Sequence, residues 1–351
     1  MIRRLITPTT TILSSKSSTA SAKVRLLTST KFNTKFCSFA TETSSTTERT
    51  INREGIQDRL PKNISLAEEF LPNDCTQEDI AKSLQEHYEW HTPVILRNVV
   101  TDSTACQKWK NLDYLVEAVG EDVFCEVEIG KGYNDPHMTK SRIPFEEYIQ
   151  YIRLFENLYG KQDKQRHKND DTTNLPKPEE MIYLAQNEMF KGLESDFVVP
   201  HFCSDASYGI GAGSLHHTMV WLGPHGTVTP LHYDPLDNLL MQMVGSKRVV
   251  LYPPMNSASS SSEPNFSNAY DSYNNDDDDN NCYYAGVNGE QYNTSPINIE
   301  DPDYEKYPNF KNAPPGMEGT LHRGDMLFIP KKWWHHIRSL ETSMSVNSWW
   351  R

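Results

Sequence analysis

TPLHYDPLDNLLMQMVGSKRVVLYPP, residues 229–254, is a series of short apolar runs divided by proline and glycine. Short apolar runs between such breaks are typical of strands that are buried in a sandwich or barrel. The same texture recurs in HHTMVWLGPHG (216–226) and in DMLFIPKKWWHHIRSL (325–340). We therefore predict an antiparallel β-sandwich or barrel from about residue 180 onward, with Gly245-Ser246 at a hairpin turn.

Amphipathic helices are predicted in the N-terminal half of the chain, together with one short strand. They are TQEDIAKSLQEHYEWH (76–91), WKNLDYLVEAVG (109–120) and IPFEEYIQYIRLFENLYG (143–160), with the strand TPVILRNVV at 92–100. Thr76 and Asp79 have capping-box spacing at the start of the first helix, and Gly120 is a stop signal for the second. The fold class predicted from these patterns is mainly β with flanking helices.

Two segments differ in composition from the rest. Residues 1–58 are rich in Ser, Thr and basic residues, and the first acidic residue is Glu42. This composition is typical of a mitochondrial transit peptide, and the alternative is a plain disordered basic tail. A low-complexity Ser, Asn and Asp insertion lies near residues 256–282, and its aspartates 276–279 indicate a solvated insertion more strongly than a calcium site. The folded domain is therefore expected over residues 59–351.

The overall composition excludes several classes of protein. No apolar run is long enough to span a membrane. The formal net charge is −13, although the leader is basic, so a nucleic-acid partner is disfavoured and a neutral or basic one is favoured. The 6 cysteines are scattered without CxxC spacing, which fits free thiols better than disulfides or a zinc site.

A metal site is indicated by His232 and Asp234, which are two residues apart on a predicted strand and so point to the same side. A further histidine follows the double tryptophan on another strand, at either His335 or His336. These two adjacent residues face opposite sides of a strand, so only one of them can join the pair. Two imidazoles and one carboxylate on one side of a metal are the signature of non-haem Fe(II) oxygenases.

These motifs, taken in order along the chain, resemble the JmjC-domain 2-oxoglutarate oxygenases over about residues 62–351. The resemblance is closest to the small hydroxylase-type branch, that of factor-inhibiting-HIF asparaginyl hydroxylase and of the JmjC arginyl hydroxylase or lysine demethylase. It implies a double-stranded β-helix, the cupin-like jelly roll. It also implies that His232, Asp234 and His335 hold Fe(II), with His336 as the competing third ligand.

The resemblance further implies a binding site for 2-oxoglutarate. Lys247 occupies the family's position for the cation that binds the distal carboxylate. Thr229 and Tyr183 match its hydroxyl partners, and Asn238 and Asn347 match amide positions near the iron and the co-substrate. Taken one at a time, Lys247 could be a surface residue of a hairpin, and the hydroxyl residues could serve ordinary packing.

Substrate selection must come from residues outside the triad. Trp221 and Trp349 correspond to family positions at the mouth of the cleft, although bulky aromatic residues are commonly core. Glu128 is a candidate to bind an Arg or Lys side chain, and the alternative is an ordinary solvent-facing glutamate.

The resemblance implies an enzyme that hydroxylates a protein side chain while converting 2-oxoglutarate and dioxygen to succinate and carbon dioxide. The alternatives are a JmjC lysine demethylase, a non-catalytic JmjC binding protein and an RNA hydroxylase, the last disfavoured by the acidic charge. A protein or peptide substrate, a monomer and a mitochondrial location are expected, with the nucleus or cytoplasm as alternative locations.

Overall fold

The computed structural model describes residues 63–72, 74–130, 137–159, 181–254, 284 and 293–351. Both the predicted leader at 1–58 and the predicted insertion near 256–282 lie outside the described residues. Among the helices that the structure describes, none is long and apolar enough to cross a membrane.

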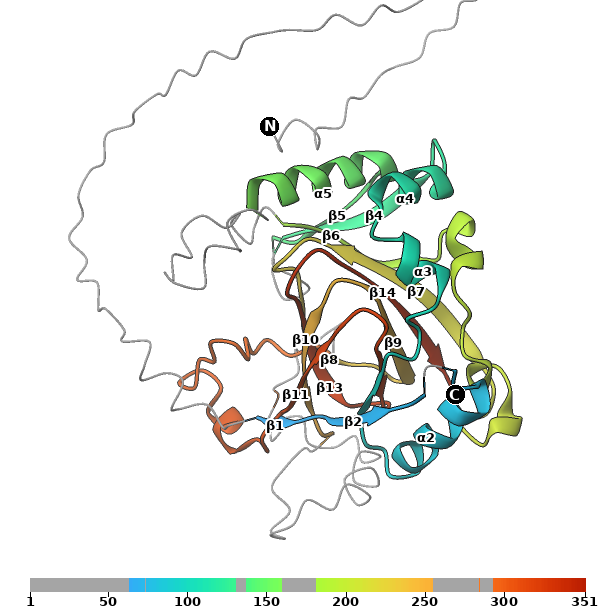
Figure 1. The fold of residues 1–351 in the computed structure, drawn as a ribbon. Helices are drawn as coiled ribbons and strands as arrows, with labels where there is room; N and C mark the ends of the chain where they lie inside the picture. The colour runs from blue at the N-terminus through green and yellow to red at the C-terminus, as the bar shows by residue number, and fades with distance from the viewer. Residues whose placement is uncertain (1–62, 73, 131–136, 160–180, 255–283, 285–292) are drawn as a thin grey trace, which may run out of the picture. The chain divides into compact units, whose positions relative to one another are not determined.

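Two β-sheets form the body of the domain (Figure 1). The first sheet has the order β1-β11-β10-β13-β8, and its strands are β1 Ile64–Ser65, β8 Val228–Tyr233, β10 Lys247–Tyr252, β11 Met317–Leu321 and β13 Trp334–Ser339. The second has the order β2-β3-β12-β9-β14-β7-β6-β4-β5, and its strands are β2 Ala67–Phe70, β3 Val94–Arg97, β4 Phe124–Ile129, β5 Thr139–Pro144, β6 Ile182–Glu188, β7 Leu215–Gly223, β9 Asp237–Val244, β12 Met326–Ile329 and β14 Ser343–Trp350. Apart from β1–β11 and β2–β3, the described strands pair antiparallel, which confirms the predicted jelly-roll architecture.

Alternation along the strands builds an apolar core between the two sheets. Val249 and Leu251 of β10 and Ile337 of β13 pack with Leu240 of β9 and Leu327 of β12. Because the core and the site both need inward-facing residues, the same alternation that buries Val249 and Leu251 also brings Lys247 to the inner side.

The helices lie against the outer side of the second sheet (Figure 1). They are α2 Gln77–Glu89, α3 Thr104–Lys108, α4 Leu112–Val119 and α5 Phe145–Tyr159. The predicted capping box is present, since Thr76 accepts from the Asp79 N–H and Asp79 accepts from the Thr76 N–H. Gly120 ends α4 with a φ of 93°, a value that glycine adopts readily.

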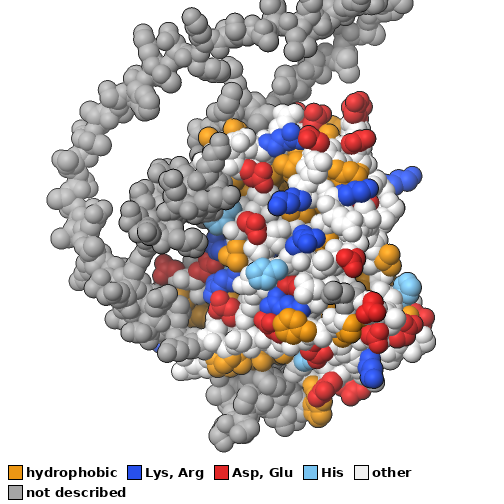
Figure 2. Space-filling model, in the orientation of Figure 1, with side chains coloured by type: hydrophobic (Ala, Val, Ile, Leu, Met, Phe, Trp, Pro, Cys, Tyr) orange, Lys and Arg blue, Asp and Glu red, His pale blue; other side chains and the backbone are white. Residues whose placement is uncertain are grey.

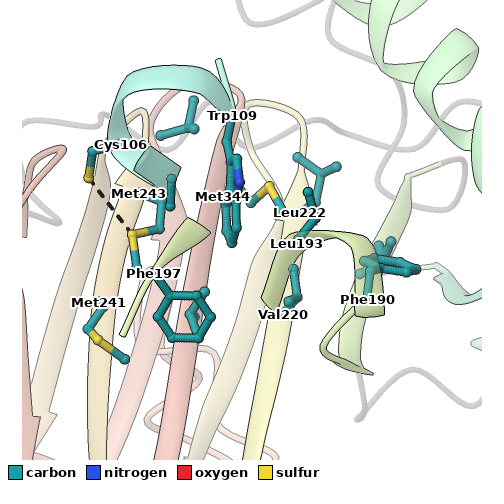
Figure 3. Packing of buried hydrophobic residues seen from close by; sticks show 14 of the residues in the cluster. Cys106, Trp109, Phe190, Leu193, Phe197, Val220, Leu222, Met241, Met243 and Met344 are labelled. Atoms are coloured by element: carbon teal, nitrogen blue, oxygen red, sulfur yellow. Dashed lines mark hydrogen bonds between the residues drawn. The ribbon is translucent and has the colours of Figure 1, made fainter. Parts of the chain in front are cut away.

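Figure 3 shows the packing under α3, where Cys106 and Trp109 lie over Met243 and Met344 of the second sheet. The Trp109 indole N–H donates to Asp196 Oδ2 at 2.7 Å, and the Tyr114 hydroxyl donates to the same carboxylate. This carboxylate lies in the 3₁₀ helix η5, Lys191–Asp196, so it fastens that segment to α3 and α4. Apolar packing thus holds the helical layer against the sheet, and a buried hydrogen-bonded acid ties η5 to α3 and α4.

Figure 2 shows acidic and basic side chains interspersed over one face of the domain. In the part of that face that the structure describes, no broad area of basic side chains stands out.

The prediction of a hairpin at Gly245-Ser246 is wrong. β9 pairs with β12 and β14, whereas β10 pairs with β11 and β13, so the two residues carry the chain from one sheet to the other. Gly245 has a φ of 69°, and a Cβ there would lie 2.3 Å from the Thr342 carbonyl oxygen. Gly245 is needed because the chain passes close to Thr342 where it crosses from one sheet to the other. Such a crossing and a hairpin turn have the same local sequence signal.

Candidate active site

Two histidines face each other across the β8–β13 ladder. His232 and His335 are paired in register, and their ring centroids are 4.1 Å apart. The Nδ1 atom of His232 lies 2.8 Å from the Pro230 carbonyl oxygen, and that of His335 lies 2.9 Å from the Trp333 carbonyl oxygen. A carbonyl oxygen can only accept, so Nδ1 carries the hydrogen in both rings and Nε2 presents a lone pair.

Asp234 completes a cluster with these lone pairs. Its Oδ1 is 4.0 Å from His232 Nε2, and its Oδ2 is 3.7 Å from His335 Nε2. The three candidate ligand atoms all lie within 4.8 Å of one another. Metal–ligand bonds to nitrogen and oxygen are about 2.0–2.2 Å long, so two ligands of one ion lie at most about 4.4 Å apart, and side-chain shifts of a few tenths of an ångström would bring all three atoms onto one ion. Of the residues that the structure describes, these three alone form such a cluster.

The structure brings His335 into the cluster and places His336 on the outer side of the sheet. His336 lies there beside Glu300 and Arg338, under the segment that precedes β11. Burial lowers the pKa of His336 to about 4, so this imidazole is neutral at ordinary pH. Leu231 is buried on the same outer side and Tyr233 packs against it, as the alternation around His232 predicts.

A β-bulge explains how Thr229 and His232 share one pocket although they are three residues apart. His335 pairs with His232, but Ile337, two residues later, pairs with Thr229. One extra residue in β8 therefore shifts the alternation. Pro230 lies within this stretch, as is common at bulges because proline has no N–H to give to a ladder.

Burial and charge act in opposite directions at the cluster. Burial alone would raise the pKa of Asp234, but the imidazoles of His335 and His232 and two N–H donors bring it below its ordinary value. For His335, burial and the neighbouring His232 lower the pKa to about 4. A deprotonated carboxylate beside the neutral imidazole of His335 is the protonation state that a metal requires of these ligands.

Lys247 projects into the same pocket from the first residue of β10. Its side chain is only 2% exposed, and Nζ donates to Ser345 Oγ at 2.7 Å. No carboxylate lies within ion-pair distance of Nζ among the residues that the structure describes. Burial lowers the pKa of this amine to about 7. A buried amine that lacks an acidic partner has the chemistry to bind an anion.

Two hydroxyl groups, those of Tyr183 and Thr229, also line the pocket. Tyr183 of β6 is hydrogen-bonded to Thr229, and burial raises the pKa of its phenol well above the ordinary value. The Tyr183 ring packs against Trp221 at a centroid distance of 5.8 Å and lies over Gly223, where a Cβ would be 2.6 Å from the ring. The hydroxyl groups of Tyr183 and Thr229 therefore both stay protonated and can donate to an anion.

Amide and indole groups hold the carboxylate of the cluster. Asn238 Nδ2 donates to Asp234 Oδ2 at 3.0 Å, and Asn347 Nδ2 donates to Asn238 Oδ1 at 2.8 Å. The Trp349 indole N–H, predicted at the mouth of the cleft, donates to the same Oδ2 at 2.8 Å. Asn347 Oδ1 is buried and has no hydrogen-bond partner among the described residues, so it can accept from a bound molecule.

Of the two remaining predicted residues, Trp221 lines the pocket and Glu128 lies outside it. Trp221 lines the pocket, and its indole nitrogen is buried without a hydrogen-bond partner among the described residues. Glu128 does not line the pocket, but it pairs directly with Tyr183 across the β4–β6 ladder and so shares its face. The Glu128 side chain is buried, with Lys140 Nζ 3.5 Å from Oε1, and burial raises its pKa. The expectation of a solvent-facing glutamate is therefore wrong.

The structure thus brings ten of the eleven predicted residues to one pocket, all except Glu128. The pocket encloses about 290 Å³, counted up to its opening. Ser345, the partner of Lys247, was missed by sequence reasoning. The signal was present, because Ser345, Asn347 and Trp349 alternate along β14 and therefore face the same side.

A second, larger hollow lies away from the cluster, with about 1760 Å³ on the same measure. It is bounded by Trp109, by Gly245 between β9 and β10, and by Thr342 between β13 and β14. Because the metal-ligand geometry and the lone buried lysine both belong to the smaller pocket, we assign the chemistry there.

Comparison with known proteins agrees with this architecture. The cupin-like domain family matches residues 81–351. The chain is 32% identical over 270 residues to lysine-specific demethylase JMJ30 of Arabidopsis thaliana, an overlap of 76% of this chain and 52% of that protein. It is 30% identical to JmjC domain-containing protein D of Dictyostelium discoideum, over 72% and 50% of the two chains. It is also 30% identical to lysine-specific demethylase 8 of Xenopus tropicalis, over 76% and 50%.

The chain spans about half the length of the curated relatives that it matches. The family match over residues 81–351 includes the His–Asp–His cluster. With a family match over 81–351 and this fold around the cluster, the chain belongs to the cupin-like family of JmjC-domain proteins.

Proposed function

We propose that this chain is an Fe(II)- and 2-oxoglutarate-dependent oxygenase that hydroxylates a protein side chain. One observation carries the proposal: the cluster of His232, Asp234 and His335 shares a pocket with Lys247, a buried amine without an acidic partner among the described residues. A metal site next to an anion site is what a metal-chelating dicarboxylate needs.

The ligand set supports Fe(II). Two imidazole Nε2 atoms and one carboxylate oxygen on one side of an ion leave the other coordination positions to smaller molecules. His232 and His335 would bind through Nε2, since each Nδ1–H is already bonded to a backbone carbonyl oxygen. When bound, iron and 2-oxoglutarate supply the oxidation of a C–H bond by dioxygen.

The wall of the pocket supports 2-oxoglutarate as the co-substrate. Lys247 Nζ and the Ser345 hydroxyl would bind the distal carboxylate, and the Tyr183 and Thr229 hydroxyls would donate further hydrogen bonds. Burial of the amine excludes water from this contact, so the ion pair is stronger than it would be at a surface. The role of these residues is to bind and orient the co-substrate beside the metal.

The substrate is proposed to be a protein with a basic side chain. Glu128 is a buried carboxylate whose Oε1 has no hydrogen-bond partner among the described residues, although Lys140 lies at ion-pair distance. It faces the same side of the sheet as Tyr183, which lines the pocket. Trp221 offers a buried indole N–H to an acceptor on the substrate. A guanidinium or ammonium group would satisfy Glu128 better than the exposed Lys140 does.

Lysine demethylation is the second candidate, favoured by the names of the Arabidopsis and Xenopus relatives. Hydroxylation of an N-methyl group gives a product that loses formaldehyde, so both outcomes use the same site. The chain resembles the hydroxylase-type branch in its motifs, and hydroxylation therefore stays our first proposal.

The test is turnover of 2-oxoglutarate to succinate by the full chain loaded with Fe(II), with His232→Ala and Asp234→Ala as inactive controls. Basic peptides with and without methylated lysine then distinguish the two candidates. Hydroxylation adds the mass of one oxygen atom, whereas demethylation releases formaldehyde. If the iron-loaded protein binds no 2-oxoglutarate, the proposal fails and a non-catalytic binding protein becomes the better description.

We also propose that the basic, acid-poor residues 1–58 direct the protein to mitochondria. The support is compositional. Imaging of a C-terminally tagged chain checks it, and a signal confined to the nucleus would contradict it.

A further inference from the structure

The carboxylate of Asp234 accepts hydrogen bonds from two N–H groups of the opposite sheet. Asp234 follows β8 of the first sheet, while its donors Asn238 and Trp349 belong to β9 and β14 of the second. Asn238 and Trp349 are directly paired across the β9–β14 ladder. One cross-strand pair therefore supplies both donors, at fixed spacing.

A third residue fixes which way the Asn238 amide points. Asn347 Nδ2 donates to Asn238 Oδ1 at 2.8 Å, so the NH₂ group of Asn238 must face Asp234. Asn238 is 1% exposed and Asn347 is 3% exposed, so water does not compete for these bonds. The chain of bonds Asn347, Asn238, Asp234 is thus directional.

Both donors fall on the same oxygen. The hydrogen bonds that Asp234 accepts from Asn238 and Trp349 end on Oδ2, at 3.0 and 2.8 Å. A carboxylate oxygen has two lone-pair sites, so these two donors use the sites of Oδ2. Oδ1, which lies 4.0 Å from His232 Nε2, keeps its lone pairs.

We propose that Trp349 and Asn238 are positioning residues that direct Oδ1 of Asp234 to the metal, so that the carboxylate binds through one oxygen only. This inference rests on the proposed metal site and deepens it. A carboxylate bound through both oxygens would occupy an additional coordination position. With two imidazoles and a co-substrate bound through two atoms, a carboxylate held to one oxygen by Asn238 and Trp349 would leave one coordination position for dioxygen.

The role assigned to Trp349 differs from that of a substrate contact at the cleft mouth. A substrate contact would change recognition of the peptide and leave the metal site unchanged. A positioning residue would change metal binding in the absence of any substrate, because partners of the ligands commonly set metal affinity. Metal binding by the substrate-free protein therefore separates the two roles.

The experiment is a titration of the metal-free full chain with Co(II), followed by the visible absorption of the bound ion. Trp349→Phe keeps a half-buried aromatic ring and removes the N–H. Trp350→Phe is the matched control, because Trp350 is the next residue, is fully buried on the other side of β14, and its indole nitrogen has no hydrogen-bond partner among the described residues. We expect Trp349→Phe to bind Co(II) about 10–100-fold more weakly, with altered band intensity, and Trp350→Phe to bind like the wild type.

Wild-type affinity and an unchanged spectrum in Trp349→Phe would overturn the inference. If that variant does not fold, Asn238→Leu removes the other donor at similar volume and is expected to weaken Co(II) binding in the same way. Failure of the proposed function looks different, since wild-type protein that binds Co(II) but no 2-oxoglutarate leaves the comparison of variants intact.

Discussion

Lys247→Met should stabilise the metal-free protein at neutral pH and lose that advantage as the pH rises. The Lys247 amine is 2% exposed, and burial lowers its pKa to about 7, whereas an unfolded lysine keeps the ordinary value of 10.5. Methionine fills similar space without the amine. The protein therefore carries a destabilising group at the position where the co-substrate is proposed to bind, and the substitution removes it.

The direction in which wild-type stability changes with pH follows from the number of protons bound by the folded and unfolded states. Between pH 7 and 10.5 the unfolded chain binds a proton at this lysine that the folded chain does not, so stability of the wild type rises with pH over that window. At about 1.4 kcal/mol for each pH unit, the rise across the window amounts to about 5 kcal/mol. Below pH 7 both states are protonated and the penalty is constant. Lys247→Met lacks this slope, and any packing difference adds only a constant offset.

The assay is urea unfolding of the full chain, followed by tryptophan fluorescence at several pH values from 7 to 10. The free energies of unfolding of Lys247→Met and wild type should converge as the pH rises. Lys110→Met, at an exposed lysine, serves as the control and should run parallel to the wild type. If Lys247→Met also runs parallel, Lys247 is charged and paired in the folded protein, and the reasoning about an empty anion position is refuted.

The lowered pKa of Lys247 also predicts proton uptake when 2-oxoglutarate binds. Above pH 7, binding of 2-oxoglutarate should be accompanied by uptake of one proton, because the anion favours the charged amine. Titration calorimetry in buffers of different ionisation enthalpy measures that proton. Binding without uptake at pH 8.5 or so would contradict the pairing of Lys247 with the distal carboxylate.

Three further outcomes are expected. Gly245→Ala should destabilise more than Gly209→Ala, since both have positive φ (69° and 74°) but only Gly245 has an atom in the way, the Thr342 carbonyl oxygen. The Gly209 change should cost about 1–2 kcal/mol in urea unfolding, and equal losses would contradict the close crossing. Arg97→Met should cost roughly 3 kcal/mol, because the buried Asp325 carboxylate loses its cation and keeps the backbone N–H donors of Asn98 and His322; a loss below about 1 kcal/mol would speak against that pair. Co(II) at about 100 times its Kd should add about 3 kcal/mol to the wild type, and no shift of the thermal midpoint would argue against a metal site.

Local patterns predicted the elements well where one segment holds the whole signal. The capping box of Thr76 and Asp79 and the stop at Gly120 are present as predicted, because each depends on neighbours a few residues away. The apolar face of α5 is likewise buried, with Phe145 and Ile152 at 1% and 0% exposure. Short-range sequence and short-range structure correspond directly in such cases.

Predictions that required knowledge of strand partners were less successful. The residues Gly245-Ser246 carry the signal of a hairpin, but the strands that flank them join different sheets. Turn residues predict that the chain changes direction, but they do not predict which strands the flanking segments pair with. The site face of Thr229 depends on a bulge between β8 and β13, which only the pairing register reveals.

At the site, the family motif and strand alternation located the ligands and the lysine, but the hydrogen bonds among them could not be predicted. Trp349 is a cleft residue by position, and its bond to Asp234 depends on the separation of two sheets. Glu128 was expected to be solvent-facing as readily as functional, and its burial depends on β4 joining β6. Contacts between sheets are absent from any single stretch of sequence.

The bonds that assemble the site join residues that are far apart in the chain. Lys247 and Ser345 are separated by 98 positions, Asn238 and Asn347 by 109, and Asp234 and Trp349 by 115. Contacts between residues so far apart in sequence stabilise the protein only late in folding, after the entropic cost of closing the long loops between them. The candidate ligands of the ion all come from the β8–β13 part of the first sheet, but the bonds that orient Asp234 reach the second sheet, so the complete site exists only when both sheets have closed. Metal should slow the unfolding of the domain while leaving its folding rate unchanged, so that it acts as a latch on the finished fold.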